Sequence, residues 1–325
     1  MRTPWKPVLG LFLLAPLVGE YLLGNVTIRD VGGLILLAPL YGGGALLIRE
    51  ATRRTGKGWP TILALGLAYG LVEAGVIDGS LFSVDYEGVD YDAVRVPFLG
   101  VSAFYGLQFV INHAVWSIGI PILLTETLTR RHRTTPWLGR IGLAVAAVVY
   151  LAAGLLIRYD SLRSGEYHVT WAQSAGVVVV ALALIALAFA LPGPSPRGSA
   201  RWVARPWLVG VAAFVLSSAY LVLPATWRGV ALTVKIVILA AWLITWLSRR
   251  AGWQSRHQVA LAAGALMTYA WAGFLITGLK HDDDPVAFAG NGVFTVAALV
   301  LVAVTFRSRA AVTGATQEVE SSRKA

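Results

Sequence analysis

The sequence contains no cysteine, so disulfide bonds, thiolate nucleophiles and cysteine metal sites are all excluded. It also lacks an HExxH motif or a comparable ligand spacing, and we therefore expect no metal and no cofactor. Charged residues are scarce, at 14% of the chain, where a soluble domain of this length normally has about 25%. This shortage of charge excludes an ordinary soluble protein.

The sequence is instead rich in apolar residues. They make up 57% of the chain, the mean hydropathy is +0.68, and apolar runs of about 20 residues recur along its whole length. Each run is long enough to cross a bilayer, whose interior offers no water to the backbone, so the runs must be helices or a closed barrel. The runs are continuous rather than alternating, which favours helices. The sequence predicts an all-α, polytopic transmembrane helix bundle with the lipid bilayer as its partner.

We predict about ten membrane spans, with ends uncertain by roughly three residues. The first is an uncleaved helix rather than a signal peptide, because it contains Glu20 and shows no clear small-x-small cleavage site. The spans are expected at about 7–25, 30–50, 60–83, 97–127, 137–158, 168–191, 206–224, 229–248, 256–279 and 285–306.

The loops between these runs alternate in charge. Of the 27 basic residues, 20 fall in the terminal segments and every second loop, six fall in the intervening loops, and Lys235 lies inside a span. The intervening loops also hold most of the acidic residues. The positive-inside rule then places both termini in the cytoplasm, with an even number of spans in the cytoplasmic membrane. This distribution also argues against binding of nucleic acid, in spite of the net charge of +10.

The two halves of the chain differ in amino-acid composition. Residues 1–127 are rich in glycine and polar residues, and small residues let helices approach closely. Residues 137–306 consist mostly of Ala, Val, Leu and Trp. We expect a single transmembrane domain over 1–306, with 1–127 as its polar, glycine-rich core and 137–306 as surrounding spans. Residues 307–325 are polar and small and are expected to form a disordered cytoplasmic tail.

Five polar side chains lie inside the predicted spans at a similar depth. At 1.5 Å of rise per residue, all five are roughly 20 Å from the cytoplasmic ends of their helices. They are Glu20, Glu73, His113, Lys235 and Asn291. Ionisable groups inside a membrane are costly, so this layer predicts either a functional site or polar contacts that join helices.

The structural alternative pairs Lys235 with Glu20 or Glu73 and leaves the other polar groups to hydrogen-bond with their neighbours. The functional alternative centres on Glu73 and His113, which lie in glycine- and asparagine-rich surroundings. The remaining polar groups would then line a pathway for a proton or a membrane-embedded or small-molecule substrate. These pathway residues are Glu20, Asp78, Gln108, Asn112, Lys235 and Asn291.

Two chemistries fit a glutamate and a histidine in lipid. Glu73 can act as a general base that activates a water molecule while His113 stabilises the developing charge. Alternatively, the same groups can relay a proton or bind a cation during transport. A protein without chemistry, in which the polar layer only joins helices, is the third possibility.

The segment FVINH (109–113) resembles the FxxxH motif of the CPBP family, the CAAX-prenyl-protease-like intramembrane enzymes. That family carries a glutamate motif on an earlier helix, and Glu73 lies 40 residues before His113. The segment VEAGVID (72–78) has one glutamate of that motif and lacks its arginine. The resemblance implies an intramembrane protease in which Glu73 is the water-activating glutamate and His113 its partner.

Overall fold

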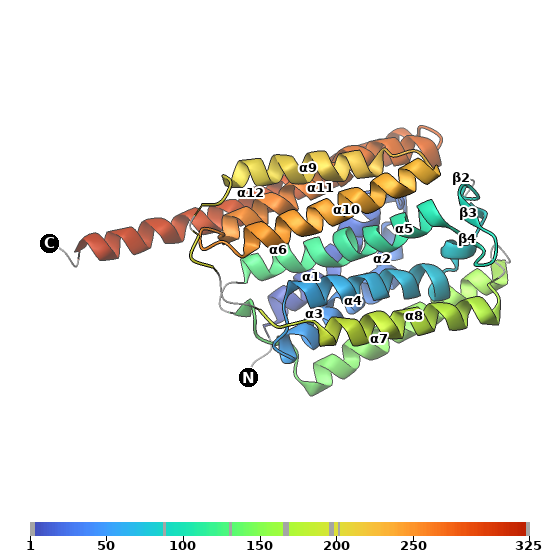
Figure 1. Ribbon diagram of the computed structural model, residues 1–325, viewed down its shortest axis with the longest axis horizontal. Helices are drawn as coiled ribbons and strands as arrows, with labels where there is room; N and C mark the ends of the chain where they lie inside the picture. Colours follow the sequence, from blue (N-terminus) through green and yellow to red (C-terminus); the bar gives the residue numbers. More distant parts are fainter. Residues whose placement is uncertain are drawn as a thin grey trace.

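The computed structural model describes residues 4–86, 89–129, 132–164, 169–194, 198–200 and 202–322. In this part of the chain, helices run back and forth along one axis and form a bundle (Figure 1). Both termini lie at the same end of the bundle, which we call the terminal face. Four short strands lie at the opposite end, which we call the hairpin face.

The first half of the chain makes four passes through the bundle, and π- and 3-10-helical turns interrupt these passes. The first pass is α1 (Trp5–Pro16) and η1 (Leu17–Tyr21), and the second is η2 (Ile28–Gly33), α2 (Leu34–Leu37), η3 (Ala38–Gly42) and α3 (Gly43–Arg54). The third is α4 (Trp59–Val72) and η4 (Glu73–Ile77), and the fourth is α5 (Ala103–Asn112), η6 (His113–Gly119) and α6 (Ile120–Leu128). The prolines near helix starts, such as Pro60, need no intrahelical N–H partner there.

The second half makes six passes, each a single α-helix. These helices are α7 (Arg140–Ser164), α8 (Trp171–Ala190), α9 (Pro206–Leu221), α10 (Trp227–Ser248), α11 (Ser255–Lys280) and α12 (Pro285–Ser322). Within the described residues, eight of the ten passes are long and apolar enough to span a membrane. Two are shorter, α1–η1 and α9. The predicted all-α, multi-pass fold is confirmed, whereas the orientation of the termini stays a prediction.

Between the third and fourth passes, the chain forms η5 (Ser80–Phe82) and two small antiparallel hairpins on the hairpin face. The strands are β1 (Asp85–Tyr86), β2 (Val89–Asp90), β3 (Arg95–Val96) and β4 (Val101–Ser102). The predicted start of the fourth span at about residue 97 is therefore wrong, since the helix begins at Ala103. Pro97 and Gly100, which has a φ of +68°, break the apolar run and turn it into a hairpin.

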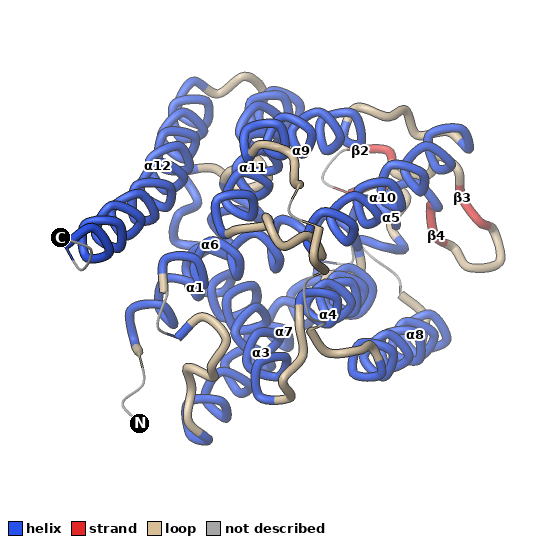
Figure 2. The backbone as a smooth tube through the Cα atoms, turned by 60° about the vertical axis from the view of Figure 1, so that its left-hand side comes forward, coloured by secondary structure: helices blue, strands red, loops and turns tan. Residues whose placement is uncertain are grey.

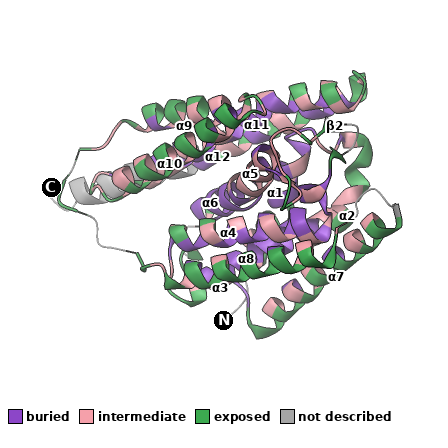
Figure 3. Cartoon of the chain, turned by 45° about the vertical axis from the view of Figure 1, so that its right-hand side comes forward, coloured by how far each residue is buried: buried purple, intermediate pink, exposed green. Residues whose placement is uncertain are grey.

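Burial separates central from peripheral helices (Figure 3). In the apolar stretches of α4, α5–α6 and α11, 61% of residues are buried, whereas the value is 22% or less in α7, α8, α10 and α12. Helix α11 thus lies in the core, although the sequence placed it among the surrounding spans. The reason is side-chain packing, in which Trp116 of η6 stacks on Tyr269 of α11 at 4.5 Å and donates to the Ala265 carbonyl.

Helix α12 runs from Pro285 to Ser322, whereas the disorder expected over 307–325 stays a prediction. Residues 307–322 contain no proline, and eight of these sixteen residues are alanine, arginine, glutamate or glutamine, which are good helix formers. Extending a helix that already exists avoids the cost of nucleation, so such a sequence can continue α12.

Candidate functional site

Four polar side chains from four passes meet inside the bundle. The Tyr41 hydroxyl donates to Glu20 Oε1 at 2.6 Å and lies 3.2 Å from both Glu73 Oε1 and His113 Nε2. His113 Nε2 lies 3.0 Å from Glu73 Oε2. The Glu73 side chain is 7% exposed and that of His113 is 12% exposed. We call these residues, Glu20, Tyr41, Glu73 and His113, the buried cluster.

Each member of the buried cluster belongs to a π-helical turn. Glu20 lies in η1 and Tyr41 in η3, while Glu73 and His113 are the first residues of η4 and η6. A π turn inserts one extra residue into an α-helix and occurs frequently at functional sites. It redirects the side chains that follow, so the four turns bring together residues that regular helices would point elsewhere.

The backbone fixes which imidazole nitrogen carries a proton. His113 Nδ1 lies 2.7 Å from the Phe109 carbonyl, which can only accept, so Nδ1 donates. A neutral ring then turns the lone pair of Nε2 towards the Glu73 carboxylate. A lone pair cannot face a carboxylate at 3.0 Å without a proton between them. The Glu73–His113 dyad therefore holds one shared proton, on either Nε2 or Glu73.

The buried cluster is short of positive charge. Glu20 accepts from Tyr41 and from the Asn25 amide at 3.2 Å, and Glu73 contacts Tyr41 and His113. In the described part of the chain, no lysine or arginine forms a salt bridge with either carboxylate. With the dyad's proton counted, the cluster still carries the charge of Glu20, which a further proton or a cation would neutralise.

The buried cluster lies towards the hairpin face. Glu20 is one residue from the end of η1, and Glu73 is four residues, or about 6 Å along the axis, from the end of η4 at Ile77. Asn25, in the turn after η1, connects Glu20 to the loop region. A hydrogen-bonded chain thus leads from the hairpin face through Glu20 and Tyr41 to the dyad.

Glycines let the four passes approach closely enough for these contacts. A Cβ at Gly70 of α4 would lie 2.8 Å from His113 Cβ, and one at Gly42 would lie 2.0 Å from the Phe12 carbonyl oxygen. Real Cβ atoms do not tolerate such contacts, so the passes could not pack in this way with larger residues. The glycines of the first half therefore allow the close helix packing that brings the residues of the buried cluster together.

Two residues of the predicted polar layer lie elsewhere. Lys235 is exposed on α10, a peripheral helix, and forms no salt bridge among the described residues, so it is not the expected partner of Glu20 or Glu73. Lys235 has a similar predicted depth to the cluster residues, but it lies on the face of α10 opposite the buried Thr233 and therefore points away from them. Asn291 is buried and donates to Thr277 Oγ1 at 2.8 Å, which joins α12 to α11.

The other predicted pathway residues contact different neighbours. Gln108 and Asn112 face α9, where Gln108 Nε2 lies 3.5 Å from the Tyr220 carbonyl and Asn112 accepts from the Tyr220 hydroxyl at 3.0 Å. Asp78 follows η4 directly, and its carboxylate accepts from the Ser80 amide at 2.9 Å. Its backbone amide donates to the Glu73 carbonyl at 3.1 Å, which makes it a neighbour of the buried cluster.

Tyr41, which touches all three other members, was missed by the sequence reasoning. A tyrosine in an apolar span normally indicates packing or an interfacial position. The available signal was its place in PLYGGG, where proline and glycines mark an irregular helix.

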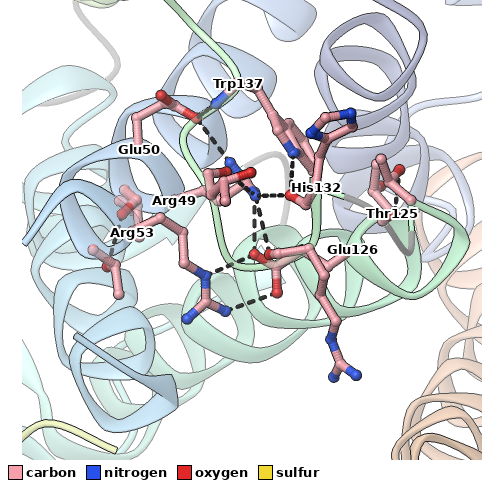
Figure 4. A network of polar contacts seen from close by, with 12 residues as sticks. Arg49, Glu50, Arg53, Thr125, Glu126, His132 and Trp137 are labelled. Atoms are coloured by element: carbon pink, nitrogen blue, oxygen red, sulfur yellow. Dashed lines mark hydrogen bonds and ion pairs between the residues drawn. The ribbon is translucent and has the colours of Figure 1, made fainter. Parts of the chain in front are cut away.

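A second polar network lies near the terminal face and joins α3, α6 and the segment before α7 (Figure 4). Arg49, Glu50 and Glu126 have fully buried side chains. Arg53 binds Glu126 through two nitrogens, at 2.8 and 2.7 Å, and Arg49 Nε lies 3.1 Å from the same carboxylate. Three guanidiniums, those of Arg49, Arg53 and Arg54, pair with the two carboxylates of this network, so both carboxylates are neutralised, unlike in the buried cluster.

The network also fixes the chain between α6 and α7. Arg49 donates to the carbonyls of His132, Arg133 and Thr135, and its guanidinium lies 3.3 Å from the centre of the Trp137 ring. The Glu50 carboxylate accepts from the amides of Trp137 and Leu138. Because nearly every polar group here is paired with protein, the network acts as a structural clamp.

The fold defines a multi-pass helical membrane protein whose interior holds the buried cluster. The chain matches a family described as an uncharacterized membrane protein family over residues 9–321, and it belongs to that family. No curated protein and no solved structure matches the chain.

Proposed function

We propose that the buried cluster binds and transfers protons, and that the protein is a proton- or cation-coupled membrane transporter. The observation that carries this proposal is that Glu20, Glu73 and His113 share one tyrosine hydroxyl, without a salt bridge from a lysine or arginine in the described residues. Such a cluster changes charge whenever it gains or loses a proton. Intramembrane carboxylate and histidine chains are typical of proton relays.

The transfer step follows from the contacts. Tyr41 gives its hydroxyl proton to Glu20 Oε1 and takes the shared proton of the dyad from His113 Nε2, so no charge forms on the phenol and the 3.0 Å contact between His113 and Glu73 opens. The proton then lies on Glu20, whose contact with Asn25 places it next to the loops of the hairpin face. The reverse sequence loads the dyad from the same face.

The experiment is infrared spectroscopy of the protein in lipid vesicles, titrated between pH 4 and pH 10. We expect a carboxyl C=O band that changes with pH, and Glu20→Gln or Glu73→Gln should remove it. The control is Asp92→Asn, which changes an exposed carboxylate on the same face. If neither cluster variant alters the carboxyl bands of the wild type at any pH, the proposal is wrong.

Transport itself is tested with vesicles that contain a trapped pH-sensitive dye and that are exposed to a panel of small solutes under a membrane potential. Wild-type protein should acidify or alkalinise the vesicle interior when its solute is present, and Glu73→Gln should abolish this change. Loss of thermal stability without any carboxyl signal or flux would instead indicate a purely structural cluster.

A second candidate function is hydrolysis within the membrane, favoured by the dyad distance of 3.0 Å and by the resemblance of FVINH and Glu73 to the CPBP motifs. Glu73 would take the proton of a water molecule, and the His113 imidazolium would stabilise the resulting oxyanion. Cleavage of quenched fluorescent transmembrane peptides, abolished by Glu73→Gln, would support this candidate. Absence of cleavage together with solute-dependent proton flux would leave transport as the function.

A further inference from the structure

The turn between β3 and β4 exposes two large apolar side chains in succession. The strands pair Arg95 with Ser102 and Val96 with Val101, and residues 97–100, which we call the hairpin tip, connect them. Phe98 is 86% exposed and Leu99 is 51% exposed. A soluble turn normally carries polar residues, so this composition requires an explanation.

The hairpin tip lies beside the start of a lipid-facing helix. A Cβ at Gly100 would lie 2.8 Å from Gln173 Nε2, in the first turn of α8. Trp171, the first residue of α8, is 92% exposed, and the apolar residues that follow it are mostly exposed as well. Figure 2 shows the turn at the edge of the molecule, near the end of α8. The tip is therefore at the level where α8 enters the bilayer.

From this position we infer that the hairpin tip inserts into the membrane interface, with Phe98 and Leu99 in the boundary between headgroups and acyl chains. Aromatic residues are enriched at this boundary, and the surface of the tip continues the lipid-facing surface of α8. The occupant of the exposed apolar surface is thus phospholipid.

Insertion would anchor the helix that carries part of the buried cluster. Ser102 of β4 accepts from the Tyr105 amide as the N-cap of α5 and donates to the Ala93 carbonyl at 2.5 Å. The hairpin and the start of α5 therefore move together. His113 follows ten residues after Ala103 on the same pass. A tip held in the lipid interface fixes the end of this pass relative to the bilayer.

The absence of cysteine allows a direct test with single nitroxide labels on the full chain in phospholipid vesicles. Labels are placed at Phe98→Cys, at Leu99→Cys as a second tip position, and at Asp92→Cys as an exposed control on the preceding loop. Spin relaxation is measured with oxygen, which concentrates in lipid, and with a water-soluble nickel chelate. We expect oxygen to dominate at 98 and 99 and nickel to dominate at 92.

Two results would overturn the inference. Equal nickel accessibility at 98, 99 and 92 would mean that the tip faces water. Protection of 98 and 99 from both reagents would mean that protein, such as a second copy of the chain, covers the tip. Size-exclusion profiles and melting temperatures identical to those of the wild type establish that the labelled variants are folded. The test does not involve the buried cluster, so its outcome is independent of the proposed function.

Discussion

Replacing Gly70 with alanine tests whether close helix contact positions the dyad. The new Cβ would lie 2.8 Å from His113 Cβ and 3.0 Å from the Val110 carbonyl oxygen, about 1 Å closer to His113 Cβ than an ordinary carbon–carbon contact. Backbone oxygen cannot yield easily, so the His113 side chain must move. A shift of about 1 Å would lengthen the 3.0 Å contact with Glu73 beyond hydrogen-bond range.

The expected stability loss combines two opposing terms. Overpacking a core contact costs about 1–3 kcal/mol, while alanine gains about 1 kcal/mol over glycine in a helix. We therefore expect Gly70→Ala to destabilise the protein by up to about 2 kcal/mol. The matched control is Gly292→Ala in α12, where no atom lies within 4 Å of the new Cβ. This control should be neutral or stabilising by up to about 1 kcal/mol.

Thermal unfolding in detergent measures the loss of stability, and the infrared titration measures the disturbance of the Glu73–His113 dyad. Gly70→Ala should lower the melting temperature and weaken the carboxyl signal of the dyad. Gly66→Ala, one turn away, should affect stability alone, because its Cβ would press on Ala114 at 3.0 Å and not on a site residue. An unchanged melting temperature and titration in Gly70→Ala would refute the argument that this glycine is required.

Three further predictions concern the polar contacts. Tyr41→Phe keeps the ring but removes the shared hydroxyl, so the infrared signals of Glu20 and Glu73 should both shift; a shift of only one would contradict a shared network. Glu126→Gln leaves the buried Arg53 guanidinium without its counter-charge and Arg49 with Glu50 alone, and it should cost about 3–5 kcal/mol of unfolding free energy, whereas a loss under about 1 kcal/mol would contradict the clamp. The Arg29 guanidinium, 2.5 Å away, lowers the pKa of Asp284 from its ordinary value to about 2. The Arg29–Asp284 ion pair therefore stabilises the folded protein slightly above about pH 4, and this stabilisation disappears as the pH falls through 2. The difference in melting temperature between Asp284→Asn and the wild type should vanish over the same range, and high salt should reduce it at every pH.

The fold class could be predicted from the sequence because each hydrophobic run determines one membrane-spanning helix and does not depend on distant residues. The sequence also indicated Glu73 and His113, since buried ionisable residues are rare in membrane spans, and the structure brings the two side chains to 3.0 Å, whereas their role stays a prediction. Helix boundaries were less certain where local breakers compete with apolarity, as at Pro97.

Depth in the membrane did not predict partners. Glu20 and Lys235 share a depth, yet one points to Tyr41 and the other lies exposed on α10. Direction around a helix axis depends on how the helices pack and on the π turns, neither of which is visible in a single sequence. Tyr41 was missed for the same reason, because its importance arises only from the three residues that surround it.

Because of the π turns, the buried cluster depends on the exact number of residues in four helical passes. Each turn contains one residue more than regular winding requires, so deleting a single residue there would restore a uniform α-helix. Everything on one side of the deletion would then rotate by about 100° relative to the other side. The protein could lose its internal site in this way while keeping its apolar surface and its number of spans. Among homologous chains, one-residue gaps at these four positions would mark those that lack the buried cluster.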